Sequence, residues 1–390
     1  MRFKIALLVL ALASFACSAN VTTFNTLPSP TPEIISPIVS DTPQPAIDSS
    51  PDSQPVVVPD AISSLHMLDV QNGWMITDAT VLQTQDGGST WHDVTPPGMH
   101  ALGSGTGASF LDSDRGWILI ADPSDPANKG ILYHTTDGGI RWNSNTVPFQ
   151  STDLYFLDDS NGWSMVNAGH DSAGNMAVRF YQTYDGGVNW TQVYSNLPTD
   201  PGAGDSLPYH GIKSGFTSIS IQEAWVSGRT FDMNDFYLYH TMDGGHTWSR
   251  VEHPLPFTDE RYITYPPIFF DAVSGILPFQ AGSEGASLLL SFTEDGGKTW
   301  TTGEPISGSG RYAIVSPENV FAWPDQFLVS KDAGKSWTSI HPNVDLSTGL
   351  VQLQFVDAQT GWVVTRDNAT VHTALYKTID GGQTWIAQVE

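Results

Sequence analysis

Four arginines in this sequence could together bind an anionic group. Each guanidinium presents a planar fork of N–H donors that matches the two oxygens of a carboxylate. All four lie in irregular segments of variable length, away from the repeated motifs of the chain. They are Arg229, Arg261, Arg311 and Arg366. The competing explanation is that they pair with nearby acidic residues, since the chain has 41 Asp and Glu against 16 Lys and Arg.

Two kinds of aromatic residue could act beside these arginines. Tyr262 and Tyr265 follow Arg261 closely, and a tyrosine hydroxyl can serve as a nucleophile. Trp323 is the one tryptophan of thirteen that lies outside the repeated motifs. The other tryptophans recur at fixed motif positions and are explained as core residues, so the tryptophan content is not evidence for carbohydrate binding. The candidate binding set is therefore the four arginines with Tyr262 and Trp323.

Acidic residues outside the motifs could supply a catalytic pair. They are Asp171, Asp205, Asp232, Asp235, Asp259, Glu260, Glu284, Asp325 and Asp367. A glycosidase needs two carboxyl groups about 5–10 Å apart, one of them with a raised pKa. The sequence does not give these separations, and exposed carboxylates are usually solvated. It contains no G-x-S-x-G, no phosphate-binding glycine loop and no paired metal-ligand spacing, so we predict no cofactor and no metal.

A repeated hairpin motif sets the positions of all these residues. Its fullest copy is SFTEDGGKTW at residues 291–300, and seven copies occur. In each copy the aspartate should bind the backbone N–H groups of the turn, the glycines should take positive φ, and the tryptophan should pack into the core. The seven aspartates are Asp86, Asp137, Asp185, Asp243, Asp295, Asp332 and Asp380.

A second motif, F-x-D followed by Gly-Trp, precedes the hairpins in full or looser form, for example at residues 110–117 and 355–362. The two motifs together give four short strands per unit. Seven such units predict an all-β fold, a seven-bladed β-propeller of four-stranded blades over residues 62–390.

In a four-stranded meander, the turns after the first and third strands share one face. The connections after the second and fourth strands form the opposite face, which we call the variable face. They fall at residues 95–106, 122–130, 167–177, 195–215, 228–236, 252–267, 280–286, 303–311, 342–350 and 365–373. Irregular insertions confined to one face are typical of the binding face of a repeat protein.

The N-terminal 61 residues have a different character. Residues 1–17 contain a basic start, an apolar run at 5–15 and Cys17, as in an export signal of the bacterial lipoprotein type. Ser14 and Phe15 depart from that pattern, and cleavage after Ala16 without lipidation is the alternative. Residues 18–61 are rich in Pro, Ser and Thr and predict a disordered linker. We expect a protein of the cell envelope, outside the cytoplasm, anchored by lipid at Cys17 or otherwise secreted.

The S/T-x-D-G-G-x-T-W hairpin resembles the Asp-box, or BNR, repeat of sialidases, xyloglucan-cleaving glucanases, sortilin-type receptors and photosystem II stability/assembly factors. Seven copies in one exported domain most resemble the last group, and the resemblance covers residues 62–390. It implies structural aspartates and a partner in a membrane complex. A sialidase-like site would require three arginines from separate blades, a Tyr with a Glu partner, and an Arg-Ile-Pro segment. This sequence contains no Arg-Ile-Pro, and sialidases have six blades.

These observations predict a non-enzymatic binding or assembly scaffold for a protein or envelope partner. The alternative is a sialidase-like glycoside hydrolase acting on extracellular glycans, which would gather the arginines and a Tyr/Glu pair around one funnel. The formal net charge of −25 repels the phosphate backbone, so we expect no nucleic-acid partner.

Overall fold

The computed structural model describes residues 61–99, 102, 106–125, 129–150, 152–282, 287–308, 310–367, 369–370 and 372–389. These residues belong to the unit Asp52–Glu390. The predicted signal peptide, Cys17 and residues 18–60 of the predicted linker lie outside the described residues.

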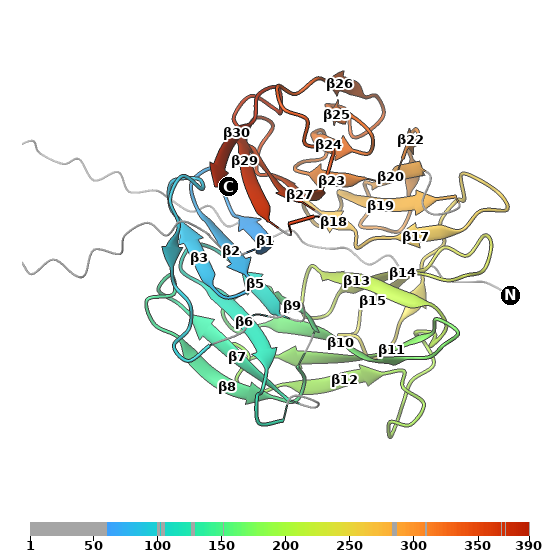
Figure 1. Cartoon of the computed structure of the whole chain (residues 1–390). Coiled ribbons are helices and arrows are strands. Elements are labelled where there is room, and N and C mark those ends of the chain that lie inside the picture. The colour runs from blue at the N-terminus through green and yellow to red at the C-terminus, as the bar shows by residue number, and fades with distance from the viewer. Residues whose placement is uncertain are drawn as a thin grey trace, which may run out of the picture. The chain divides into compact units, whose positions relative to one another are not determined.

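The described residues fold into β-strands and contain no helix (Figure 1). The strands follow one another in antiparallel meanders, each built from consecutive chain segments. The first meander contains β1 (Ile62–Met67), β2 (Gly73–Thr77), β3 (Val81–Thr84) and β4 (His92–Asp93). The second contains β5 (Gly107–Phe110), β6 (Gly116–Ala121), β7 (Gly130–Thr135) and β8 (Asn143–Val147). The third contains β9 (Thr152–Phe156), β10 (Gly162–His170), β11 (Met176–Thr183) and β12 (Thr191–Ser195).

The fourth and fifth meanders are joined into one ten-stranded sheet. The fourth contains β13 (Ile212–Ser218), β14 (Ala224–Arg229), β15 (Leu238–Thr241) and β16 (Ser249–Arg250). The fifth contains β17 (Tyr262–Thr264), β18 (Ile268–Phe269), β19 (Gly275–Ala281), β20 (Ser287–Thr293), β21 (Thr301–Thr302) and β22 (Ile306–Ser307). A single residue pair, Arg229 with Ile263, connects them. This pair brings the end of β14 beside β17 on the variable face.

The last two meanders again have four strands each. The sixth contains β23 (Arg311–Ile314), β24 (Val320–Trp323), β25 (Phe327–Ser330) and β26 (Thr338–Ile340). The seventh contains β27 (Leu350–Phe355), β28 (Gly361–Arg366), β29 (Thr373–Thr378) and β30 (Ile386–Val389). In Figure 1 the meanders follow one another around a common centre, as in a β-propeller.

Side chains join the seventh meander to the first. The Gln352 amide accepts from Leu65 N at 3.0 Å and donates to Leu65 O at 2.6 Å. Gln354 makes the same two bonds with Met67, at 2.9 and 2.8 Å. Two glutamine side chains thus satisfy backbone groups of β1 that a neighbouring strand would otherwise bind. Within the described residues the two ends of the array meet without sharing a strand.

The Gly-Trp tryptophans hold neighbouring meanders together. The indole of Trp74 is fully buried and donates to Asp112 O at 3.0 Å, in a turn of the next meander. Trp117 donates in the same way to Gly186 O at 2.9 Å and stacks on Phe156, with ring centroids 3.8 Å apart. The repeated tryptophan therefore fills the core and also links its own meander to the next one.

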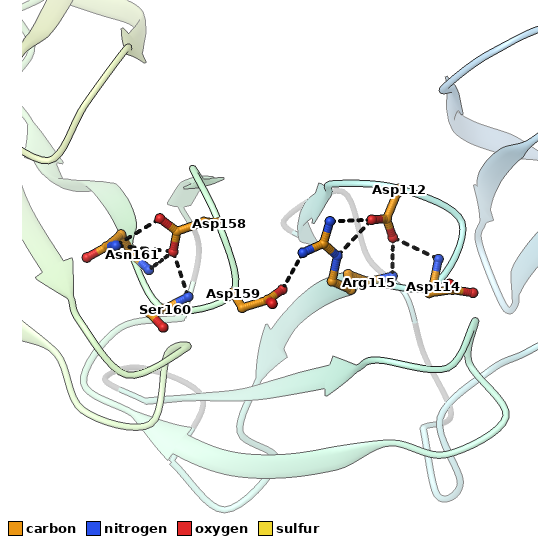
Figure 2. Close-up of polar contacts among 7 residues, drawn as sticks. All are labelled: Asp112, Asp114, Arg115, Asp158, Asp159, Ser160 and Asn161. Atoms are coloured by element: carbon orange, nitrogen blue, oxygen red, sulfur yellow. Dashed lines mark hydrogen bonds and ion pairs between the residues drawn. The ribbon is translucent and has the colours of Figure 1, made fainter. Parts of the chain in front are cut away.

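The F-x-D turns lie on the same face as the hairpin turns, as the meander geometry predicts. Gly138 N in the second hairpin donates to Asp114 O in the F-x-D turn of the same meander at 2.9 Å. In that turn Asp112 accepts from Arg115 N at 2.8 Å and from Arg115 Nε at 2.7 Å, and Arg115 also reaches Asp159 of the third meander at 2.8 Å (Figure 2). Asp159 is largely exposed, so this ion pair should add little stability.

Candidate functional site

The carboxylates of the hairpin aspartates form hydrogen bonds within their own turns. In Asp295, Oδ1 accepts from Thr293 Oγ1 and from Thr299 N at 2.9 Å, and Oδ2 accepts from Thr299 Oγ1 at 2.7 Å. These bonds, led by that from the Thr299 hydroxyl, lower the pKa of Asp295 to about 2. Equivalent contacts occur at Asp86, Asp137, Asp185, Asp243, Asp332 and Asp380.

The four candidate arginines are exposed at the ends of strands on the variable face. Arg229 ends β14, Arg311 begins β23, Arg366 ends β28, and Arg261 precedes β17. None of the four forms an ion pair with a described residue. The other described arginines each bind an aspartate; they are Arg115, Arg141, Arg179 and Arg250. The neutralising partners that the acidic composition suggested are therefore not seen among the described residues.

Tyr265 lies near two of these arginines along the strands. Arg229 pairs with Ile263, two residues before Tyr265, and Arg311 directly precedes Tyr312. Burial raises the pKa of the Tyr265 hydroxyl, and the positive charges of Arg229 and Arg311 act in the opposite direction. The Tyr265 ring also packs edge-on against Tyr312, with centroids 5.9 Å apart.

A cavity of about 350 Å³ opens beside Tyr265, between the fifth, sixth and seventh meanders. We call it the Tyr265 cavity, and its lining residues are Tyr265, Gln280, Gly310, Arg311, Trp323, Pro324, Ser347 and Leu350. Strand pairing places Trp323 opposite Arg311. Trp323 is only 4% exposed, so it belongs mainly to the core and contributes a wall of the cavity.

Gln280 is the cavity residue with the weakest signal in the sequence. It is 8% exposed, lines the cavity, and its side chain makes no hydrogen bond with a described residue. Its amide atoms are not among the fully buried polar atoms of the described residues that lack a partner, so they are open to the cavity. Its one sequence signal is a polar residue at the end of the otherwise apolar strand that runs through Ile276–Phe279.

A second cavity, of about 440 Å³, lies on the seventh meander and includes Arg366, Asp345 and Asp367. Each carboxylate is bound within its own loop: Asp345 accepts from Ser347 Oγ at 2.6 Å and Asp367 from Ala369 N at 2.7 Å. These bonds lower the pKa of both groups. A glycosidase acid needs a raised pKa, so this pair lacks the electrostatics of a general acid.

The remaining candidate residues, Tyr262 and Arg261, do not line either cavity. Tyr262 is 1% exposed, and its hydroxyl donates to Phe257 O at 2.6 Å. It lies in a core cluster with Leu277 and Phe279. Arg261 is exposed but lines neither cavity. The structure thus gathers Arg229, Arg311 and Trp323 near Tyr265, and places Tyr262 in the interior.

Neither a metal cluster nor a membrane-spanning helix occurs in the described part of the chain. That part contains no group of three His, Cys, Asp or Glu side chains that could hold a metal ion. It also has no helix with the length and apolar character needed to cross a bilayer.

Comparison with known proteins points to one family in sequence and fold. A family model for photosynthesis system II assembly factor YCF48 matches residues 279–390, from within β19 to the C-terminus. A xyloglucanase of Paenibacillus sp is 24% identical over 284 residues. That match covers 65% of this chain and 26% of the xyloglucanase, so the chain spans about a quarter of that relative's length.

Two solved structures share the fold. A structure of YCF48 bound to D1 peptide superposes with a TM-score of 0.55 at 20% identity, covering 87% of this chain and 99% of that one. YCF48 from Cyanidioschyzon merolae gives 0.53 at 16% identity, covering 84% and 98%. At these identities the likeness concerns the fold alone. The chain is thus a β-propeller similar in fold to YCF48, and residues 279–390 also match the YCF48 family model.

Proposed function

We propose that this protein is an exported, seven-bladed β-propeller that binds a protein partner through its variable face and acts as an assembly-type scaffold. The observation that supports this most is that four arginines, Arg229, Arg261, Arg311 and Arg366, form no ion pair with any residue that the structure describes, on a chain with net charge −25. Unpaired cations on an acidic protein are suited to an acidic segment of a partner. The YCF48 structure with D1 peptide offers a precedent for peptide binding on this fold.

The arginines are expected to control partner binding. The triple variant Arg229→Gln, Arg311→Gln, Arg366→Gln should recover at least about tenfold less partner from envelope extracts, a loss of ~1.4 kcal/mol or more. The measurement is a quantitative pull-down with the full chain at two salt concentrations. Arg141→Gln is the matched control, because Arg141 is exposed on the hairpin face. Equal recovery by the triple variant, or an equal loss with Arg141→Gln, would contradict the proposal.

A glycoside hydrolase remains the second candidate, and the xyloglucanase match favours it. The lowered pKa values of Asp345 and Asp367 speak against a catalytic pair in the second cavity. Assays for release of reducing sugar from xyloglucan, and of sialic acid from sialosides, separate the two functions. Hydrolysis of either substrate that is lost in Asp367→Asn would contradict the scaffold function and support a glycoside hydrolase.

The proposal includes a lipid anchor at Cys17, which rests on the sequence of residues 1–17. Cys17→Ser should release the protein from the membrane fraction into the soluble fraction, because the thiol that carries the lipid would be lost. Fractionation of cells that express each form measures this. Retention of the variant on membranes would contradict lipidation at Cys17.

A further inference from the structure

We infer that the Tyr265 cavity captures the C-terminal carboxylate of a peptide chain. This inference rests on the proposed binding function and names the chemical group that the variable face recognises. The cavity combines a cationic rim, an amide that is open to the cavity and a tryptophan wall, supplied by Arg311, Gln280 and Trp323.

The rim selects for negative charge. Arg311 lines the cavity without an ion pair to a described residue, and no carboxylate is among the lining residues. Arg229, at the end of β14, pairs through its backbone with Ile263, two residues before Tyr265. A carboxylate placed beside Tyr265 would therefore meet a forked guanidinium donor and a second positive charge nearby.

The Gln280 amide distinguishes a peptide from a simple anion. Gln280 is 8% exposed and makes no side-chain hydrogen bond with a described residue, yet its amide atoms are not among the fully buried polar atoms that lack a partner. The amide is therefore open to the cavity that it lines. Its two N–H donors and its carbonyl acceptor match the C=O and N–H of the last peptide group of a bound chain.

The wall favours a side chain over a sugar ring. Trp323 is 4% exposed and packs with Phe327 and Trp385 in a core cluster, so it offers no open face for stacking. Leu350 and Pro324 lie beside it, but most of the exposed lining of the cavity is polar. The volume of about 350 Å³ lies at the small end of ligand pockets, which are about 300–1,000 Å³. It is suited to one terminal residue rather than to an oligosaccharide.

The test is calorimetric titration of the full chain with N-acetylated tetrapeptide pools that end either in a free carboxylate or in an amide. The free-acid pool should bind at least tenfold more tightly than the amide pool. Arg311→Gln and Gln280→Met should each weaken the free-acid pool at least fivefold without a change in melting temperature. Arg141→Gln is the matched control, because Arg141 is an exposed arginine on the hairpin face that lines neither cavity.

Titration with glucuronate tests whether the bound carboxylate belongs to a peptide or to a sugar acid. Equal affinity for both pools, or glucuronate binding more tightly than the free-acid pool, would overturn the inference. If Gln280→Met does not fold, Tyr265→Phe is titrated instead and should weaken the free-acid pool relative to the amide pool. If the free-acid pool is not preferred but recovery of an envelope partner still depends on the arginines, this inference alone is rejected. Loss of both would reject the proposed function as well.

Discussion

Trp362→Ala is expected to lower the free energy of unfolding by ~3–5 kcal/mol, the usual cost of removing a buried tryptophan. The Trp362 indole is fully buried at the junction of the seventh and first meanders and donates to Gly87 O at 3.0 Å. The Lys377 ammonium lies 5.2 Å from its ring centroid. The same core cluster includes Leu65 of β1 and Leu375 of β29. The variant therefore loses packing, a hydrogen bond and a cation–π contact at the place where the two ends of the array meet.

Denaturant unfolding measures the free energy, and hydrogen exchange locates the loss. Exchange should accelerate at β1 and β29, whereas β9–β12, which lie far from this junction in sequence, should keep their protection. Trp163→Ala is the matched comparison, because Trp163 is equally buried between the third and fourth meanders. A loss below ~1 kcal/mol, or unchanged exchange at β1, would show that the two glutamines alone close the array.

Lys213→Met is expected to cost a similar ~3–5 kcal/mol, because it removes a buried charged donor from a cluster of carbonyl oxygens. Lys213 is 4% exposed. Its ammonium donates to five backbone carbonyls, those of Met176, Pro208, Tyr209, His210 and Gly211, at 2.7 to 3.3 Å. Burial lowers the pKa of Lys213 to about 7, and the carbonyl oxygens favour the charged form against that effect.

The Lys213 contacts fix a long connection on the variable face. Asn196 donates to Leu207 O and Pro208 O in the same segment, at 3.2 and 3.1 Å. In Lys213→Met the amides of Leu207 and of residues 209–211 should exchange faster, and thermal and denaturant unfolding should both show the loss. Lys298→Met, at an exposed hairpin position, should change stability by less than ~0.5 kcal/mol. A Lys213→Met protein as stable as the wild type would mean that water replaces the ammonium among the carbonyls.

The sequence alone was sufficient for the β-propeller fold and for the face on which each turn lies. Both follow from local signals, because Asp, Gly and Trp at fixed spacing specify a tight turn and a buried residue without help from distant segments. Gly296 and Gly297, for example, have φ of 72° and 80°, which the D-G-G pattern demands. The same locality explains why the role of Asp295 in its turn follows from the residues around it.

The candidate site could be predicted only in part. Arg311 and Trp323 were recognisable because they stand outside the repeats. Which tyrosine faces the cavity was not recognisable, since Tyr262 and Tyr265 lie only three positions apart, at the start of β17 and directly after its end. The choice depends on packing: Tyr262 is enclosed by the core around Phe279, whereas Tyr265 turns toward Tyr312. Gln280 was missed because burial of a polar side chain leaves no mark on the sequence beyond its neighbours.

By itself, the sequence determined seven repeated hairpins, the strands between them and the excess of negative charge. The tertiary structure decided which arginines form no ion pair with a described residue, that Arg311 and Tyr265 line one cavity, and that Gln352 and Gln354 join the last meander to the first. The physical reason is the separation in sequence of the residues that make contact. Turn formation depends on residues within about four positions of one another, whereas these contacts join segments that only the completed array brings together.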